Sequence, residues 1–221
     1  MSPAGKTLNR GGRPPRLSQN AIVDVGERIL VRDGIEALTM RRVAKELGSS
    51  PMAVYRHVQD KDELLVLILD RLVARLPRPE LPDNPQDRLI ELWKLLHGQL
   101  IRHPWAIEVL AAGDMMAPSV LWIVEEILAT FVKAGLDRKC AAAAYRAVWH
   151  FTLGEALVRT ATRRRTDELD RPPFAIVLVS DVDREQMPNL ACLSDQWSTA
   201  RETDSYPEGL KAMITGWLSS T

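Results

Sequence analysis

The chain of 221 residues lacks the features that define secreted and membrane proteins. It contains only two cysteines, Cys140 and Cys192, which cannot form a disulfide framework, so we interpret both as reduced cytosolic thiols. No run of 18 apolar residues is present, which argues against a transmembrane helix. No apolar signal-peptide segment follows the basic start. We therefore expect a cytoplasmic protein that makes no membrane contact.

Catalytic and metal-binding motifs are also missing. The sequence has no HExxH, no CxxC and no group of histidine and cysteine at zinc-ligand spacing. It has neither a GxSxG nucleophile elbow nor a phosphate-binding glycine loop. We expect no catalytic residue, no metal site and no cofactor, and an enzyme is the disfavoured class.

The formal charge is zero overall, but it is unevenly distributed along the chain. Residues 1–61 contain 11 Lys and Arg against 6 Asp and Glu, a net charge of +5, and the remainder carries −5. A basic head on an acidic body suits a protein that places only its head on a polyanion such as DNA.

A stretch near the N-terminus has the spacing of a helix-turn-helix. Apolar residues three and four positions apart form one face of a first helix, which Thr39 would cap and Gly48 would end. Ser50 would cap a short second helix that runs to about Val58. A capping signal then opens a third helix at Lys61.

The second short helix has two distinct faces. Val54 and Val58 point inward, whereas Met52 and Arg56 point the opposite way. A guanidinium binds phosphate or guanine, and apolar groups contact thymine methyls, so the outward face is typical of a helix that reads the major groove. The alternative is a solvated helical hairpin inside some all-α protein that never binds DNA.

Residues 1–17 form a basic segment without apolar periodicity, which we expect to be a flexible arm. Prolines keep the Gly11–Arg16 stretch extended, and arginines match the negative potential of a narrow, A·T-rich minor groove. The alternative is a solvated basic tail. The predicted DNA-binding residues are Arg13, Arg16, Thr39, Arg41, Arg42, Ser50, Met52, Ala53, Tyr55, Arg56, His57 and Lys61.

The same stretch resembles the DNA-binding domain of the TetR family of bacterial transcriptional regulators. The resemblance covers about residues 18–66 and rests on Thr39, Ala44, Leu47–Gly48, Tyr55–Arg56–His57 and Lys61–Leu65. It departs from the family at Met52 and Ala53, where many relatives carry small polar residues. We therefore expect hydrogen-bonded readout of base edges to be sparse.

The rest of the chain is predicted to be helical, so the fold class is all-α. We expect a connector helix, a break at the prolines of residues 77–85, and further helices at 85–103, 105–111, 119–134, 137–162 and 206–218. Residues 163–205 show no clear helix, and Phe174–Val179 is read as an irregular loop or a strand. The predicted domains are the arm 1–17, the helix-turn-helix domain 18–66 and a helical effector-binding and dimerisation domain 67–221.

A small-molecule cavity in the body is predicted from its aromatic and flexible side chains. The alternative is that these residues are plain core, and that His97 and His150 are hydrogen-bonded core histidines rather than metal ligands. Arg146 and His150 lie one turn apart as a polar anchor, unless Arg146 reaches a surface carboxylate or a second copy. The predicted effector-binding residues are Trp93, His97, Trp105, Met115, Met116, Trp122, Phe131, Arg146, Trp149 and His150.

Together these patterns predict a sequence-specific DNA-binding regulator, a repressor that a small apolar effector releases. The resemblance implies a homodimer on a palindromic operator, with residues 137–162 and 206–218 of each subunit in a four-helix interface. The alternative is a sequence-tolerant helical DNA- or protein-binding module without an effector.

Overall fold

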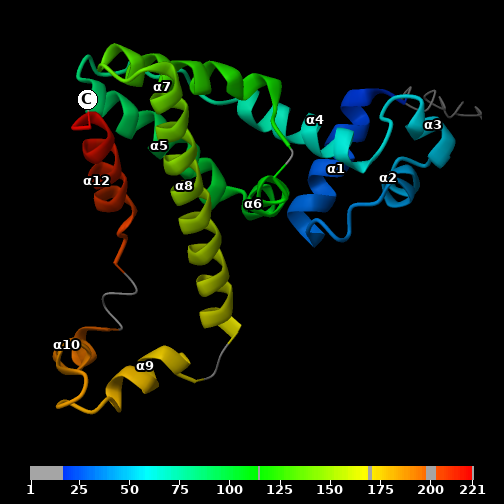
Figure 1. Cartoon of the computed structure of the whole chain (residues 1–221). Coiled ribbons are helices and arrows are strands. Elements are labelled where there is room, and N and C mark those ends of the chain that lie inside the picture. The colour runs from blue at the N-terminus through cyan, green and yellow to red at the C-terminus, as the bar shows by residue number, and fades with distance from the viewer. Residues whose placement is uncertain (1–16, 114, 169–170, 198–202, 221) are drawn as a thin grey trace, which may run out of the picture. The chain divides into compact units, whose positions relative to one another are not determined.

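The computed structural model describes residues 17–113, 115–168, 171–197 and 203–220, and every regular element within these ranges is a helix (Figure 1). The all-α prediction is therefore confirmed. The chain divides into two compact units, residues 1–68 and 69–221, and the division falls inside the helix α4 (Lys61–Ala74). The predicted arm, with Arg13 and Arg16, lies outside the described residues.

The first unit is built from α1 (Gln19–Asp33), α2 (Met40–Glu46), α3 (Pro51–Tyr55) and the start of α4. Side-chain oxygens of Ser18, Thr39 and Ser50 accept backbone N–H groups three residues on, at 3.2, 3.2 and 3.3 Å. These bonds satisfy N–H groups that a helix start leaves unpaired.

Two side-chain-to-backbone hydrogen bonds form the start of α4. Asp60 accepts the backbone N–H of Glu63 at 2.8 Å, and the Glu63 carboxylate accepts the backbone N–H of Gln59 at 2.5 Å. The helix therefore begins where the sequence predicts. At the preceding helix the boundary differs, because α3 ends at Tyr55 and residues 56–57 form a turn before Val58.

Apolar side chains of α1 to α4 form a common core in this unit. Gly26 allows the closest approach, since a Cβ atom at that position would lie 2.9 Å from Ile68 Cδ1 and 3.3 Å from Leu64 Cδ2. The buried residues are Ile22, Val23, Val25, Ile29, Leu30, Leu38, Met40, Val43, Ala44, Val54, Val58, Leu64, Leu65 and Ile68.

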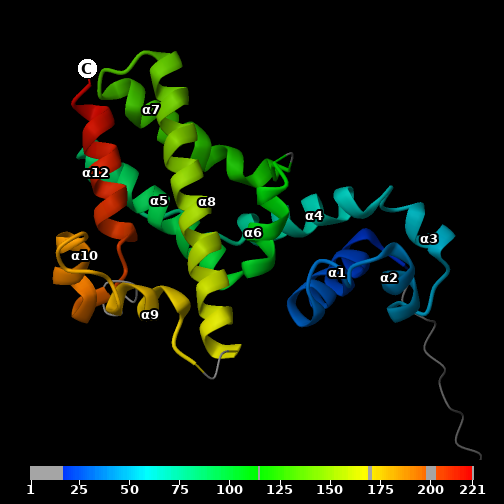
Figure 2. The ribbon, with the colours of Figure 1, turned by 60° about the horizontal axis from the view of Figure 1, so that its bottom comes forward.

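The second unit is a helical body in which α12 packs on α5 and α8, and α7 packs on the same pair (Figures 1 and 2). Its core includes the fully buried Trp93 and Phe131. The helices are α5 (Pro85–Arg102), α6 (Pro104–Ala111), η1 (Pro118–Val120), α7 (Leu121–Lys133), α8 (Arg138–Glu168), α9 (Phe174–Ser180), α10 (Pro188–Leu193), η2 (Ser194–Gln196) and α12 (Tyr206–Leu218).

The prediction for residues 163–205 is wrong in two respects. Helix α8 continues to Glu168, and Phe174–Val179 belongs to the helix α9 rather than to a loop or strand. Pro173 begins α9, where its carbonyl accepts the N–H of Ile176 at 2.9 Å. A proline at a helix start outweighs the weak strand preference of the three β-branched residues that follow, Ile176, Val177 and Val179.

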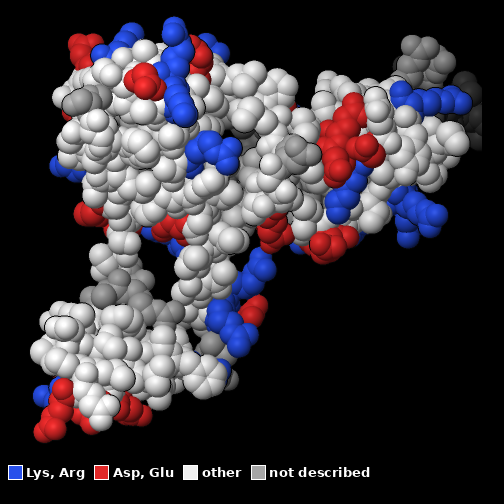
Figure 3. Space-filling model, in the orientation of Figure 1, with Lys and Arg blue, Asp and Glu red and all other residues white. Residues whose placement is uncertain are grey.

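The helices α9 and α10 pack on each other and on η2. They leave Phe174 and Leu178 exposed by 76% and 72%, and the space-filling view shows a largely uncharged surface over this region (Figure 3). An exposed apolar surface of this kind is typical of an interaction site.

Within the described residues no helix combines the length and apolar character that a membrane crossing requires.

Candidate nucleic-acid interface and body cavity

Helix α3 presents an outer face that its own packing leaves open. Val54 and Val58 are fully buried in the core of the first unit, which is called the head from here on. Their burial fixes the orientation of this five-residue helix. On the opposite side Met52 is 68% exposed and Tyr55 47%, and Arg56 is exposed as well. The arrangement predicted for the second helix of the motif is therefore the one that the structure has.

Two of the predicted phosphate-binding cations have partners inside the head. Arg42 forms ion pairs with Asp33 and, at 3.5 Å, with Glu46, while Arg32 bridges the same two carboxylates at 2.8 Å. The hydrogen bond from Arg32 is the largest cause of the lowered pKa of both Asp33 and Glu46. These contacts join α1 to α2, so Arg42 has a structural role.

Lys61 has a similar structural role. Its Nζ donates a 2.9 Å hydrogen bond to the Ile35 carbonyl, which ties the start of α4 to the turn after α1. Arg41 and Arg56, by contrast, are exposed, and neither makes a side-chain hydrogen bond or ion pair with the described residues. Of the predicted DNA-binding cations in the motif, these two are the most available to DNA.

The remaining predicted residues surround α3. Thr39 and Ser50 use their side chains as helix caps, Ala53 is half-buried, and the His57 side chain is exposed. The His57 carbonyl accepts a 3.4 Å hydrogen bond from Gln19 of α1, which helps to hold the end of the motif.

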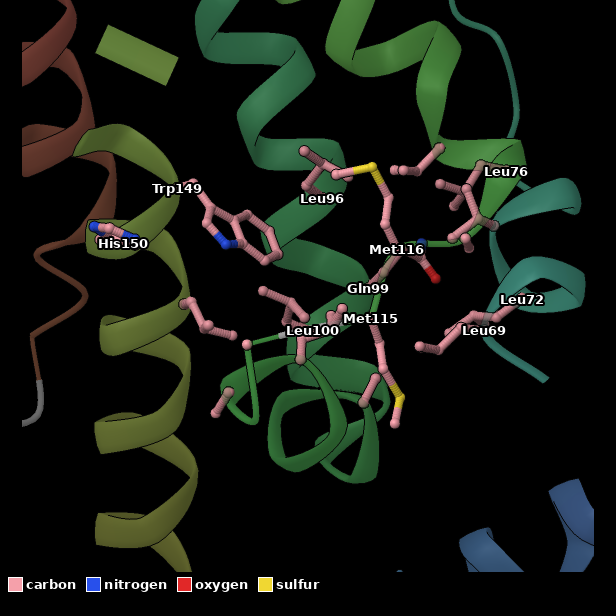
Figure 4. A pocket seen from close by; sticks show the side chains of 18 of the residues that line it. Leu69, Leu72, Leu76, Leu96, Gln99, Leu100, Met115, Met116, Trp149 and His150 are labelled. Carbon is pink, nitrogen blue, oxygen red and sulfur yellow. The ribbon is translucent and has the colours of Figure 1, made fainter. Parts of the chain in front are cut away.

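A cavity of about 390 Å³ lies within the body, a size in the range of small-molecule sites. Figure 4 shows Trp149 projecting into it from α8, with Met116 lying across from it. The cavity is lined by Leu69, Leu72, Val73, Leu76, Leu96, Gln99, Leu100, Ala106, Leu110, Ala111, Gly113, Met115, Met116, Ala117, Val120, Tyr145, Arg146, Trp149, His150 and Leu153.

Half of the predicted effector residues line this cavity, namely Met115, Met116, Arg146, Trp149 and His150. The others lie elsewhere in the body. Trp93 and Phe131 are part of the core, Trp105 is buried on α6, the Trp122 ring lies 5.1 Å from the Arg78 guanidinium carbon, and His97 contacts Glu155.

Sequence analysis missed the contribution of α4 and the polar residues Gln99 and Tyr145. Leu72 and Leu76 are spaced by four residues on the connector helix, which is the only signal that marked them as a face. Burial raises the pKa of the Tyr145 phenol, so this group is neutral at physiological pH.

A chain of polar contacts lies beside the core and joins α5, α8 and α12. His97 Nε2 lies 2.5 Å from Glu155 Oε2, and Glu155 Oε1 accepts a 2.6 Å hydrogen bond from Arg159. Arg159 also pairs with Asp204, just before α12. The His97 ring stacks on Tyr206 at 3.7 Å, and the Tyr206 hydroxyl bonds Thr152 at 3.0 Å.

This network lowers the pKa of Asp204, mainly through the Arg159 hydrogen bond, and burial raises the pKa of Tyr206. Because the folded-state pKa of Asp204 lies below its unfolded value, the contact stabilises the fold near neutrality. That stabilisation is lost as the pH falls through the lowered pKa. His97 therefore belongs to a structural network rather than to the cavity wall.

The described residues contain no group of three or more metal-binding side chains.

The head and body define a helix-turn-helix DNA-binding protein with a cavity-bearing helical domain, and comparison with known proteins agrees. The model for bacterial regulatory proteins of the tetR family matches residues 22–68. The model for the tetracyclin repressor-like C-terminal domain matches residues 78–220. The chain belongs to the TetR family and is a DNA-binding transcriptional regulator, not an enzyme.

Individual relatives span nearly the whole chain. The HTH-type transcriptional repressor DrrR1 of Streptomyces coeruleorubidus is 29% identical over 230 residues, covering 96% of this chain and 81% of that protein. Apo ActR of Streptomyces coelicolor is 25% identical with a TM-score of 0.77, covering 95% and 97%. ActR in complex with actinorhodin, also 25% identical, has a TM-score of 0.75 and coverage of 94% and 98%.

The structure of BioQ with its natural double-stranded DNA operator is similar as well. It is 28% identical with a TM-score of 0.59, covering 68% of this chain and 92% of that one.

Proposed function

We propose that the protein is a dimeric repressor that binds a palindromic operator and leaves it when a small molecule fills the body cavity. The observation that carries the proposal is the open outer face of α3, with Arg56 unpaired among the described residues and Val54 and Val58 fully buried behind it. A rigid short helix with an exposed guanidinium is suited to the major groove. Such a regulator acts in the cytoplasm, where the operator is.

The relatives support three parts of this proposal: repression, operator binding and ligand binding. DrrR1 is named a transcriptional repressor, BioQ was solved with its operator, and ActR was solved with actinorhodin. We extend operator binding and ligand binding from these proteins to this chain.

A homodimer is supported by the outer faces of α8 and α12. A Cβ atom placed at Gly154 of α8 or Gly216 of α12 would meet nothing within 4 Å, so both backbones are open to close approach by another helix. Beside Gly154, Leu157 and Val158 expose 44% and 64% of their side chains. Two copies joined here would present two heads to half-sites about one helical turn, or roughly 34–36 Å, apart.

Helix α4 supplies the connection between cavity and head. Its first part packs in the head through Leu64 and Ile68, and its second part lines the cavity through Leu69 and Leu72. A ligand that displaces the second part moves the first along with it. The ligand releases DNA only if it binds the two arrangements of α4 with different affinity.

Replacing Arg56 with alanine is expected to weaken operator binding by about 10- to 100-fold while changing nonspecific binding far less, because a base-reading guanidinium contributes about 1–3 kcal/mol. Arg41→Ala is the matched variant, since its cation is also exposed but lies on α2. It should weaken binding to both kinds of duplex alike. Titration of operator and scrambled duplexes by fluorescence anisotropy at two salt concentrations measures the difference.

Equal losses on operator and scrambled DNA for Arg56→Ala would contradict base reading by α3. That outcome would favour a sequence-tolerant helical module, whose binding depends steeply on salt but little on sequence.

A further inference from the structure

The charges around the body cavity are one-sided. Among the described residues that line it there is no aspartate or glutamate, and Arg146 is the one lysine or arginine. Among the described residues Arg146 has no hydrogen-bond or ion-pair partner. A guanidinium at the edge of the cavity carries little free-energy cost while it remains in contact with water. A ligand that covers it without forming a hydrogen bond or ion pair removes this water and leaves a desolvated charge, which is unfavourable.

Most of the polar residues that line the cavity come from one helix, α8. Arg146, Trp149 and His150 lie within about one turn of α8, whereas the Gln99 amide, from α5, lies toward Leu72 and Leu76 (Figure 4). In Figure 4, Trp149 points into the cavity, whereas His150 lies at the outer margin of α8. The opposite wall, formed by α4 and α6, contributes only leucine, valine and alanine side chains.

We propose that the effector is an amphipathic anion, with a hydrophobic body that fills the cavity against α4 and α6 and one acidic group that binds Arg146 on α8. This inference rests on the proposed function of the cavity as the effector site. The guanidinium offers two parallel N–H donors to a carboxylate or sulfonate. The free energy of this charge-assisted contact offsets the cost of desolvating the guanidinium. Met115 and Met116 adapt the apolar part to the shape of the ligand.

Two fluorescent probes that share one hydrophobic body test the assignment. The full-length protein is titrated with 1-anilinonaphthalene-8-sulfonate, which carries an acidic group, and with N-phenyl-1-naphthylamine, which lacks it. Arg146→Met should weaken binding of the sulfonate about tenfold and leave binding of the neutral probe unchanged. Arg146→Lys should restore most of the sulfonate affinity, and Arg138→Met, which removes an exposed cation from the start of the same helix, should change neither.

A cavity-filling variant, Leu153→Trp, identifies the site that the probes occupy, and it should displace both of them. Competition with 2-naphthoate and with decanoate then distinguishes a ring system from an acyl chain as the hydrophobic body. Displacement by either carboxylate supports the anionic class.

Equal weakening of both probes by Arg146→Met would overturn the assignment, because Arg146 would then only pack against the ligand. Failure of both carboxylates to compete would overturn it too. If Leu153→Trp displaced neither probe, the cavity itself would not bind them, and the proposed effector site would fail together with this inference. Operator binding by the head is measured in a separate experiment, so the conclusion about DNA binding does not depend on these probe results.

Discussion

Leucine in place of Gly154 is expected to produce a folded monomer that binds the operator about 100- to 10,000-fold more weakly than the wild type, because two linked heads gain that much from avidity. Within one subunit the Cβ of the new side chain meets no described atom within 4 Å. Leucine also favours a helix interior over glycine by roughly 0.8 kcal/mol. Since the described residues leave this Cβ free, we expect the side chain to obstruct a second copy packed on α8.

Gly98→Leu is the matched control for this experiment. It makes the same change in the middle of α5, where a Cβ also meets nothing within 4 Å, but on a helix outside the proposed interface. Light scattering should give the control twice the chain mass of 24.8 kDa and Gly154→Leu a single chain mass. A dimer of normal stability in Gly154→Leu would show that the copies associate through another surface.

Removing the carboxylate of Glu155 is expected to give the largest loss of stability among single polar substitutions in the network. Glu155→Ala leaves His97 without its hydrogen-bond partner and removes one of the two carboxylates that hold Arg159. The pair is largely but not fully buried, with side-chain exposures of 10% and 16% for His97 and Glu155. We therefore expect a cost of about 2–3 kcal/mol, the upper range for losing hydrogen bonds to a charged group, and a Tm lowered by roughly 5–10 °C.

Thermal unfolding followed by circular dichroism measures this effect. Glu91→Ala is the control, because Glu91 pairs with Lys94 in an exposed i,i+3 contact on the same α5 helix that carries His97. Its expected cost is at most about 0.5 kcal/mol. Similar melting temperatures for Glu155→Ala and Glu91→Ala would mean that the network adds little to the stability of the body.

The helix-turn-helix was predictable because its determinants are local. Thr39, Ser50 and Asp60 each cap a backbone N–H three residues on, so neighbouring residues alone set these helix starts. The inward face of Val54 and Val58 follows from the helical period alone. The end of α3 was placed three residues too late, because the closing turn keeps a helical hydrogen bond from the Val58 N–H to the Val54 carbonyl, 3.1 Å long.

Local signals reveal far less of the cavity and the α9 region. The cavity exists where distant segments fail to fill space, as between Leu69 on α4 and Leu153 on α8, and no periodicity encodes that gap. Aromatic residues at helical spacing therefore divided between core, as at Trp93, and cavity wall, as at Trp149. In α9 the β-branched residues suggested a strand, but a single short segment cannot form one without a partner.

Selection of binding sequences from random duplex DNA with the purified full-length protein tests the central claim most directly. The account predicts recovery of an inverted repeat whose half-sites lie about one helical turn apart, because two copies of α3 must enter successive major grooves. Uniform recovery with no repeated motif would contradict it, and would mean that the head binds DNA without reading its sequence.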